Sequence, residues 1–81
     1  MNFGLAIESL KRGQKVSRAG WNGRGMWIAL SVPDLDSTPS SALRGAVMSL
    51  PYIYMKTVQG DLVPWLASQT DVLAEDWEIL P

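Results

Sequence analysis

Apolar residues recur every three or four positions near the start of the chain, at Phe3, Ala6, Ile7 and Leu10. This spacing places side chains on one face of an α-helix. Asn2 is a suitable N-cap, and Gly13 is a common residue just after a helix end. Lys11 and Arg12 fall in the last turn, where positive charge interacts favourably with the helix dipole. The pattern predicts a short amphipathic helix over residues 3–12.

Later segments alternate between apolar and polar residues, which predicts β-strands. The expected strands cover residues 15–20, 26–32, 52–58, 62–65 and 77–80. Asn22-Gly23, between the first two strands, is the strongest hairpin signal in the chain. Gln59-Gly60-Asp61 forms a second turn, between the third and fourth strands. Pro33 ends the second strand, because proline cannot donate a hydrogen bond to a sheet.

A second helix is predicted just before the last strand. Ser68 is its N-cap, and Asp71 at the third position after the cap is a weak relative of the capping box. Residues 33–50 contain turn and cap residues without a sustained period, and Ser41–Leu50 allows a helical turn that Gly45 weakens. The predicted fold class is therefore α+β, with a single antiparallel sheet of about five strands and two short helices.

Size and composition limit the chemistry of this chain. With 81 residues it forms one domain, taken here as residues 1–81, and its core is small. The absence of cysteine and histidine excludes zinc fingers, thiol redox chemistry and nucleophile–histidine pairs. Hydrophobic residues make up 47% of the chain and include four tryptophans, more than so small a monomer readily buries. We therefore expect self-association, and we expect no metal or cofactor.

Charge is distributed unevenly along the chain. Residues 1–30 contain five basic residues and one acidic residue, whereas residues 31–81 contain two basic and seven acidic residues. A net charge of −1 disfavours general nucleic-acid binding, which draws its affinity from phosphate neutralisation. A few arginines still suffice for a small phosphorylated ligand. Because no signal peptide or long apolar run is visible, we expect a soluble, intracellular protein.

Two acidic pairs and one glycine pair are candidate catalytic or phosphate-binding groups. Asp34/Asp36 and Glu75/Asp76 have no obvious basic or nucleophilic neighbour in sequence, so solvated loop carboxylates are the favoured interpretation. Gly23-Arg24-Gly25 lacks the lysine and long helix of a phosphate-binding loop, and an ordinary turn explains it.

Arg18 lies on an expected strand close to Trp21 and Asn22. Arginine binds phosphate through two parallel hydrogen bonds, and aromatic faces stack on bases for about 1–3 kcal/mol each. A surface arginine beside a core tryptophan is an equally good interpretation of these residues, and the sequence leaves both open.

Several motifs together resemble the Thoeris anti-defence sponge family. They are Arg18-Ala19-Gly20-Trp21-Asn22-Gly23, Met26, Met55-Lys56-Thr57, the run VPWLASQTD at residues 63–71, and Ala74-Glu75-Asp76-Trp77. The similarity covers nearly the whole chain, and the C-terminal run is its most specific part. Only residues 33–50 depart from the family pattern, in a region where relatives vary in length and sequence.

The resemblance implies a phage-encoded protein that acts in the host cytoplasm and sequesters cyclic ADP-ribose isomers without cleaving them. TIR-domain enzymes make these signals, which would otherwise activate the Thoeris effector. Some family members are hexamers that also bind cyclic oligonucleotide signals, such as cyclic di- or trinucleotides, at separate sites. For this chain we expect a small-molecule ligand, a homodimer or hexamer, and no membrane, DNA or RNA partner. The expected ligand-binding residues are Arg18, Trp21, Asn22, Met26, Arg44, Met55, Thr57, Trp65, Ser68, Gln69 and Asp71.

Two other functions compete with this interpretation. One is a small hydrolase that destroys cyclic nucleotide signals through one of the acidic pairs. The other is a structural or nucleic-acid-binding phage protein, which the acidic C-terminal part disfavours.

Overall fold

The computed structural model describes residues 1–21, 25–33 and 50–81. Its elements are α1 (Phe3–Lys11), β1 (Val16–Arg18), β2 (Trp27–Ser31), β3 (Tyr52–Lys56), β4 (Leu62–Pro64), α3 (Gln69–Leu73) and β5 (Trp77–Ile79). All strand pairs are antiparallel, and the five strands form one sheet. The predicted α+β class is confirmed for these residues. The Asn22-Gly23 turn and, apart from Leu50, the helical turn allowed at Ser41–Leu50 lie outside the described residues.

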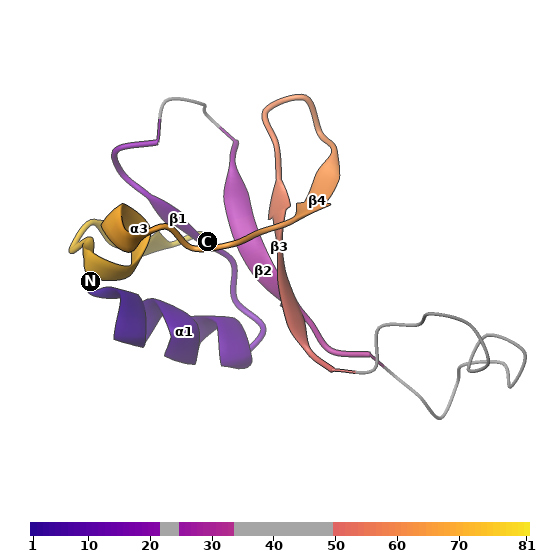
Figure 1. Cartoon of the computed structure of the whole chain (residues 1–81), viewed down its shortest axis with the longest axis horizontal. Coiled ribbons are helices and arrows are strands. Elements are labelled where there is room, and N and C mark those ends of the chain that lie inside the picture. Colours follow the sequence, from indigo (N-terminus) through magenta and orange to yellow (C-terminus); the bar gives the residue numbers. More distant parts are fainter. Residues whose placement is uncertain (22–24, 34–49) are drawn as a thin grey trace, which may run out of the picture.

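The strand order is β4-β3-β2-β1-β5, so the last strand pairs with the first rather than with its neighbour in sequence. Val16 of β1 lies opposite Ile79, and Arg18 lies opposite Trp77. The β3–β4 hairpin extends away from the helices, which gather at the β1–β5 end of the sheet (Figure 1). This topology brings the C-terminal segment beside β1, where the candidate site lies.

The sheet has two faces, because successive side chains of a strand point to opposite sides. We call one of them the helix face; its strand residues are Val16, Arg18, Ile28, Leu30, Ile53, Met55, Val63, Trp77 and Ile79. We call the other the open face; its strand residues are Ser17, Trp27, Ala29, Ser31, Tyr52, Tyr54, Lys56, Leu62, Pro64 and Glu78. Helix α1 packs on the helix face, as its contacts with β5, β1 and β2 show.

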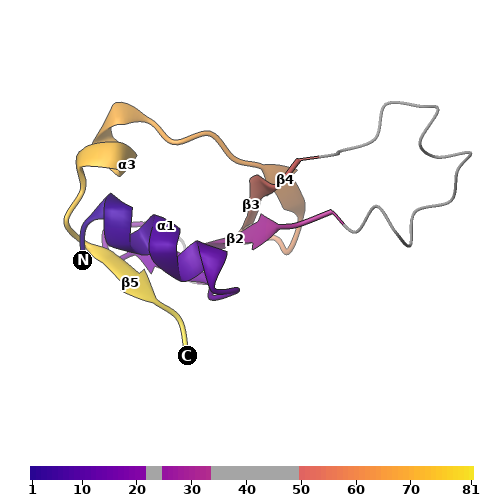
Figure 2. The ribbon, with the colours of Figure 1, turned by 90° about the horizontal axis from the view of Figure 1, so that it is seen from below.

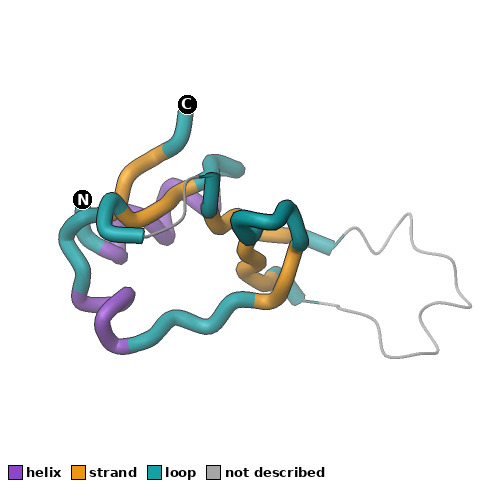
Figure 3. The backbone as a smooth tube through the Cα atoms, turned by 90° about the horizontal axis from the view of Figure 1, so that it is seen from above, coloured by secondary structure: helices purple, strands orange, loops and turns teal. Residues whose placement is uncertain are grey.

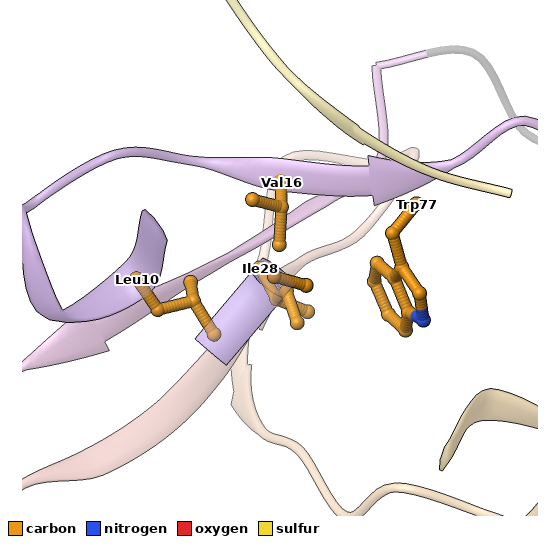
Figure 4. Packing of buried hydrophobic residues seen from close by; sticks show 5 residues of the cluster. Leu10, Val16, Ile28 and Trp77 are labelled. Atoms are coloured by element: carbon orange, nitrogen blue, oxygen red, sulfur yellow. The ribbon is translucent and has the colours of Figure 1, made fainter. Parts of the chain in front are cut away.

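The core lies between α1 and the helix face. Ala6 and Leu10 of α1 are buried against Val16, Ile28 and Trp77, each of them at most 2% exposed (Figure 4). Asn2 caps the helix as predicted, since its side-chain oxygen accepts a 2.9 Å hydrogen bond from the Leu5 amide. The first helix therefore forms for the local reasons that the sequence indicates, and its apolar stripe buries the centre of the sheet.

The β3–β4 hairpin also follows its predicted turn. Gly60 has a φ of 94°, a conformation that suits glycine, and the Thr57 hydroxyl accepts a hydrogen bond from the Asp61 amide. Pro64 is tolerated in β4 because this strand is at the edge of the sheet. After β4, the chain crosses in front of β3 and β2 to reach α3 (Figure 1), and Figures 2 and 3 show this crossing as an arch. Neither helix of the described residues has the length and apolar character needed to cross a bilayer.

Candidate functional site

Four aromatic side chains from distant parts of the chain meet at the β1–β5 end of the sheet. This aromatic cluster consists of Phe3, Trp21, Trp65 and Trp77. Trp77 is at its centre, with ring centroids 5.3 Å from Phe3, 5.5 Å from Trp21 and 6.1 Å from Trp65. Its contacts with the other two tryptophans are edge-to-face, a geometry worth about 0.5–1.5 kcal/mol per pair beyond the burial of area.

The tryptophans of the cluster differ in exposure: Trp77 forms its buried base, and Trp21 and Trp65 form its partly exposed rim. Trp77 is only 2% exposed, whereas Trp21 and Trp65 are half-buried and their centroids lie 6.5 Å apart. Trp65 belongs to the arch between β4 and α3, and its amide donates a hydrogen bond to the Ile53 carbonyl. The cluster therefore anchors the arch to the sheet and leaves part of two indole rings accessible.

Arg18 lies beside this cluster and joins β1 to the C-terminal segment. Its Nε donates to Asp76 and its Nη1 donates to Asp71, both at 2.9 Å. Asp76 also accepts a hydrogen bond from the Gly20 amide. The strand register explains the Asp76 contact, because Arg18 lies opposite Trp77 and Asp76 precedes Trp77 in the chain. We call Arg18, Ser68, Asp71 and Asp76 the Arg18 network.

Asp71 links this network to the start of α3. One carboxylate oxygen accepts from Arg18, and the other accepts from the Ser68 amide and hydroxyl. The Ser68 hydroxyl in turn accepts from the Asp71 amide, so the capping box is complete. The Asp71 carbonyl accepts a 2.9 Å hydrogen bond from the Trp77 indole. The capping box that the sequence indicated only weakly is therefore complete. Through Asp71 it connects α3 to β1 and to the aromatic cluster.

The electrostatics of the network favour ionised carboxylates. Partial burial opposes ionisation of Asp71, but hydrogen bonds from the Ser68 amide, the Ser68 hydroxyl and Arg18 outweigh it and lower the pKa of Asp71. The pKa of Asp76 is lowered first by the Arg18 hydrogen bond, against a smaller effect of burial. The same two carboxylates raise the pKa of the Arg18 guanidinium, mainly through their hydrogen bonds. One arginine between two aspartates leaves this group with a net charge of −1.

The lowered pKa values predict a loss of stability in acid. In the folded state both aspartates bind protons less readily than in the unfolded state, so their contribution is complete above about pH 4 and falls as the pH drops through their folded pKa values. We expect the melting temperature of Asp76→Asn to fall less than that of the parent protein as the pH drops below about 4. Melting curves between neutral and acidic pH measure this. Glu8→Gln, which removes an exposed carboxylate on α1, should retain the parent decline, and an equal decline in both variants would contradict the assignment.

Removal of the Ser68 cap should weaken the docking of α3. We expect Ser68→Ala to lower the free energy of unfolding by about 0.5–2 kcal/mol, because the Asp71 amide loses its acceptor. Ser68→Gly should cost less, since glycine is itself an acceptable N-cap. Denaturant titration of the two variants measures both values. Equal stability of Ser68→Ala and the parent would show that the capping box contributes nothing.

The structure brings some of the predicted ligand-binding residues together and separates others. Arg18, Ser68 and Asp71 meet in the network, and Trp21 contacts Trp65 in the aromatic cluster. Met26 and Met55 are half-buried, and Met55 lies on the helix face. Thr57 belongs to the β3–β4 turn, whereas Gln69 is exposed on α3 and lines a hollow with Ala67, Val72 and Leu73. Asn22 and Arg44 lie outside the described residues.

Three residues of this site were not predicted from the sequence: Phe3, Asp76 and Trp77. The interpretation of Asp76 as a solvated loop carboxylate is wrong, because it forms an ion pair with Arg18 that only the β1–β5 pairing creates. The Arg18–Asp76 contact spans 58 positions, so no local pattern indicates it. The repeated tryptophans were the available signal for the aromatic cluster. Asp34 and Asp36 lie outside the described residues, and no group of three or more acidic side chains within the described ranges could hold a metal ion.

Fold and site together define a small α+β domain with an aromatic cluster beside an ion-paired arginine. The sequence model of the Thoeris anti-defense 2-like domain (Tad2-like) matches residues 1–80. The curated protein Thoeris anti-defense 2 of Bacillus phage SP01 is 40% identical over 84 residues, which covers 99% of this chain and 94% of that protein. The chain therefore belongs to the Thoeris anti-defense 2-like family, and the resemblance seen in its motifs is confirmed.

Proposed function

We propose that this protein is a phage anti-defence protein that binds and sequesters cyclic ADP-ribose isomers in the host cytoplasm and thereby blocks Thoeris immunity. Family membership over residues 1–80 is the observation that carries the proposal, because it supports an anti-Thoeris function. The signals of this system are small phosphorylated nucleotides, so the protein needs affinity and slow release rather than chemistry.

The aromatic cluster suits the base of such a ligand. The half-buried Trp21 and Trp65 offer indole surface for stacking of an adenine. The Arg18 network holds the arch beside these rings, because Asp71 ties α3 to β1 and Trp65 precedes α3 by a few residues. We propose that the base binds against the rim of the aromatic cluster. Arg18 and Arg44 are the candidates for contact with the phosphates.

The charges bear on the role of Arg18. Two carboxylates already accept hydrogen bonds from its guanidinium. A phosphate in direct contact would therefore add another anion to a group with a net charge of −1. Arg18 has two possible roles, as a direct phosphate ligand or as a residue that positions the arch, and variants of Asp76 distinguish them.

Sequestration is tested by recovery of the ligand. The protein is incubated with the product of a TIR-domain enzyme, separated from free nucleotide, heated to unfold it and centrifuged, and the released nucleotide is identified by mass spectrometry. We expect intact cyclic ADP-ribose isomer and no activation of the Thoeris effector before heating. A linear product would overturn sequestration and favour the hydrolase alternative. Absence of retained nucleotide would overturn the proposed ligand class.

A further inference from the structure

The chain between β4 and β5 lies over the helix face and buries little of its own side-chain area. We call residues 65–74, which comprise the arch and α3, the strap. Six of its ten residues are exposed and none is buried, whereas α1 on the same face buries Ala6, Ser9 and Leu10. The strap reaches from one edge strand of the sheet to the other (Figures 1 and 2). An element with so little buried area opens at a lower free-energy cost than the whole domain.

Two residues attach the strap to the rest of the domain. At its start, the Trp65 amide donates a 3.1 Å hydrogen bond to the Ile53 carbonyl, and the Trp65 ring packs edge-on against Trp77. Near its end, the Asp71 carboxylate accepts from Arg18 and the Asp71 carbonyl accepts from the Trp77 indole, both at 2.9 Å. Trp77 therefore takes part in both attachments.

Between these attachments the strap is stabilised by its own hydrogen bonds. Among the residues that the structure describes, the hydrogen bonds of residues 66–70 stay within the strap, where Ser68 bonds with Thr70, Asp71 and Val72. These internal bonds do not depend on the two attachments. When the attachments break, the strap therefore moves as one piece.

The geometry of the aromatic cluster gives this movement a role in binding. Trp21 and Trp65 meet edge-on, with 64° between their ring planes, so a flat base does not stack on the faces of both rings in this arrangement. A base that stacks on both needs the two rings to face each other across it. Trp21 is held at the end of β1, because its amide donates to the Arg18 carbonyl. Trp65 is therefore the ring that has to move, and it belongs to the strap.

We propose that the strap is the closing element of the nucleotide site and that Asp71 is its latch. The inference rests on the proposed function, since the base of the nucleotide is what enters beneath Trp65. Opening frees the Trp65 ring from the cluster, and closure then places this ring on the base and excludes water from it. Asp71 is a positioning residue, because it acts through Arg18 and Trp77. Slow release follows, since the ligand leaves only when the latch opens.

Hydrogen exchange followed by NMR measures the opening directly. The two reporters are the Trp65 amide and the Trp77 indole proton, one at each attachment. In the free protein we expect similar protection factors for the two, at least about tenfold lower than those of the amides that pair β2 with β3. Saturation with a cyclic ADP-ribose isomer should raise both by at least about tenfold. Reporters that exchange only as slowly as the β2–β3 amides would overturn the strap as a moving element.

Binding kinetics test the latch. Asp71→Asn removes the charge that faces Arg18, so the open form should be more populated. We expect the association and dissociation rate constants for a cyclic ADP-ribose isomer both to rise at least about threefold, as stopped-flow tryptophan fluorescence measures. Asp61→Asn is the matched control with parent rates, because Asp61 is an exposed carboxylate in the β3–β4 turn. Faster dissociation with unchanged association would overturn the latch, since a preformed site predicts that result.

The exchange measurement needs no variant, so it decides the proposal even if Asp71→Asn fails to fold. Reporters that keep their free-protein protection factors while an isomer is bound would also overturn the strap as the closing element, and sequestration would stand. Failure of every isomer to bind would instead overturn the proposed function, and the role of the strap with it.

Discussion

Replacement of Trp77 by alanine is expected to unfold the domain or leave it barely stable. Trp77 is 2% exposed, contacts the other three rings of the aromatic cluster and packs against the core beneath α1 (Figure 4). Truncation of a buried tryptophan costs about 3–5 kcal/mol. A domain of this length has a total stability of roughly 4–12 kcal/mol, at about 0.05–0.15 kcal/mol per residue. The expected loss is therefore a large part of the total stability of the domain.

Thermal melting followed by circular dichroism measures this effect. Trp77→Phe is the control, because it keeps an aromatic ring in the cluster but removes the indole donor to the Asp71 carbonyl. We expect an intermediate loss of stability for it. A cooperative transition for Trp77→Ala at the parent temperature would show that the aromatic cluster does not support the fold.

Replacement of Arg18 by alanine is expected to weaken binding of a cyclic ADP-ribose isomer by at least about tenfold while the core stays folded. The core residues beneath α1 do not include Arg18, so the effect should be local to the arch and the ligand. Isothermal titration calorimetry measures the affinity, and circular dichroism checks the fold. Binding of Arg18→Ala at the parent affinity would exclude Arg18 from the site.

Asp76→Asn separates the two possible roles of Arg18. If Arg18 only positions the arch, loss of an Asp76 charge weakens the network and should lower affinity in the same direction as Arg18→Ala. If Arg18 binds a phosphate, the same variant removes a competing anion and should leave affinity unchanged or increased. Arg44→Ala, in which we also expect a loss of at least about tenfold, tests the second arginine in the same assay.

Much of this fold is predictable because its signals are local. The helical spacing in α1, the Asn2 and Ser68 caps and the Gly60 turn each depend on residues within a few positions of one another. The sequence also predicts where the strands lie, although the observed strand ends differ from the predicted ones. β1 is shorter than the predicted 15–20 because the Trp21 amide bonds to the Arg18 carbonyl and turns the chain.

The candidate site is predictable only in part, because it depends on which strands pair. Nothing near Arg18 in sequence indicates that β5 returns to lie beside β1. Without that pairing, Asp76 has no visible partner, and Trp77 is only another apolar residue. Trp65, Ser68 and Asp71 were found through the family motif, whereas their junction with Arg18 required the tertiary structure.

Native mass spectrometry with cyclic ADP-ribose isomers is the sharpest test of sequestration by this protein, since it reports copy number and bound ligand together. We expect an assembly of at least two copies whose mass rises by whole numbers of intact ligand at micromolar ligand concentration. Folded protein whose mass is unchanged by every isomer, or that releases linear product, would contradict it.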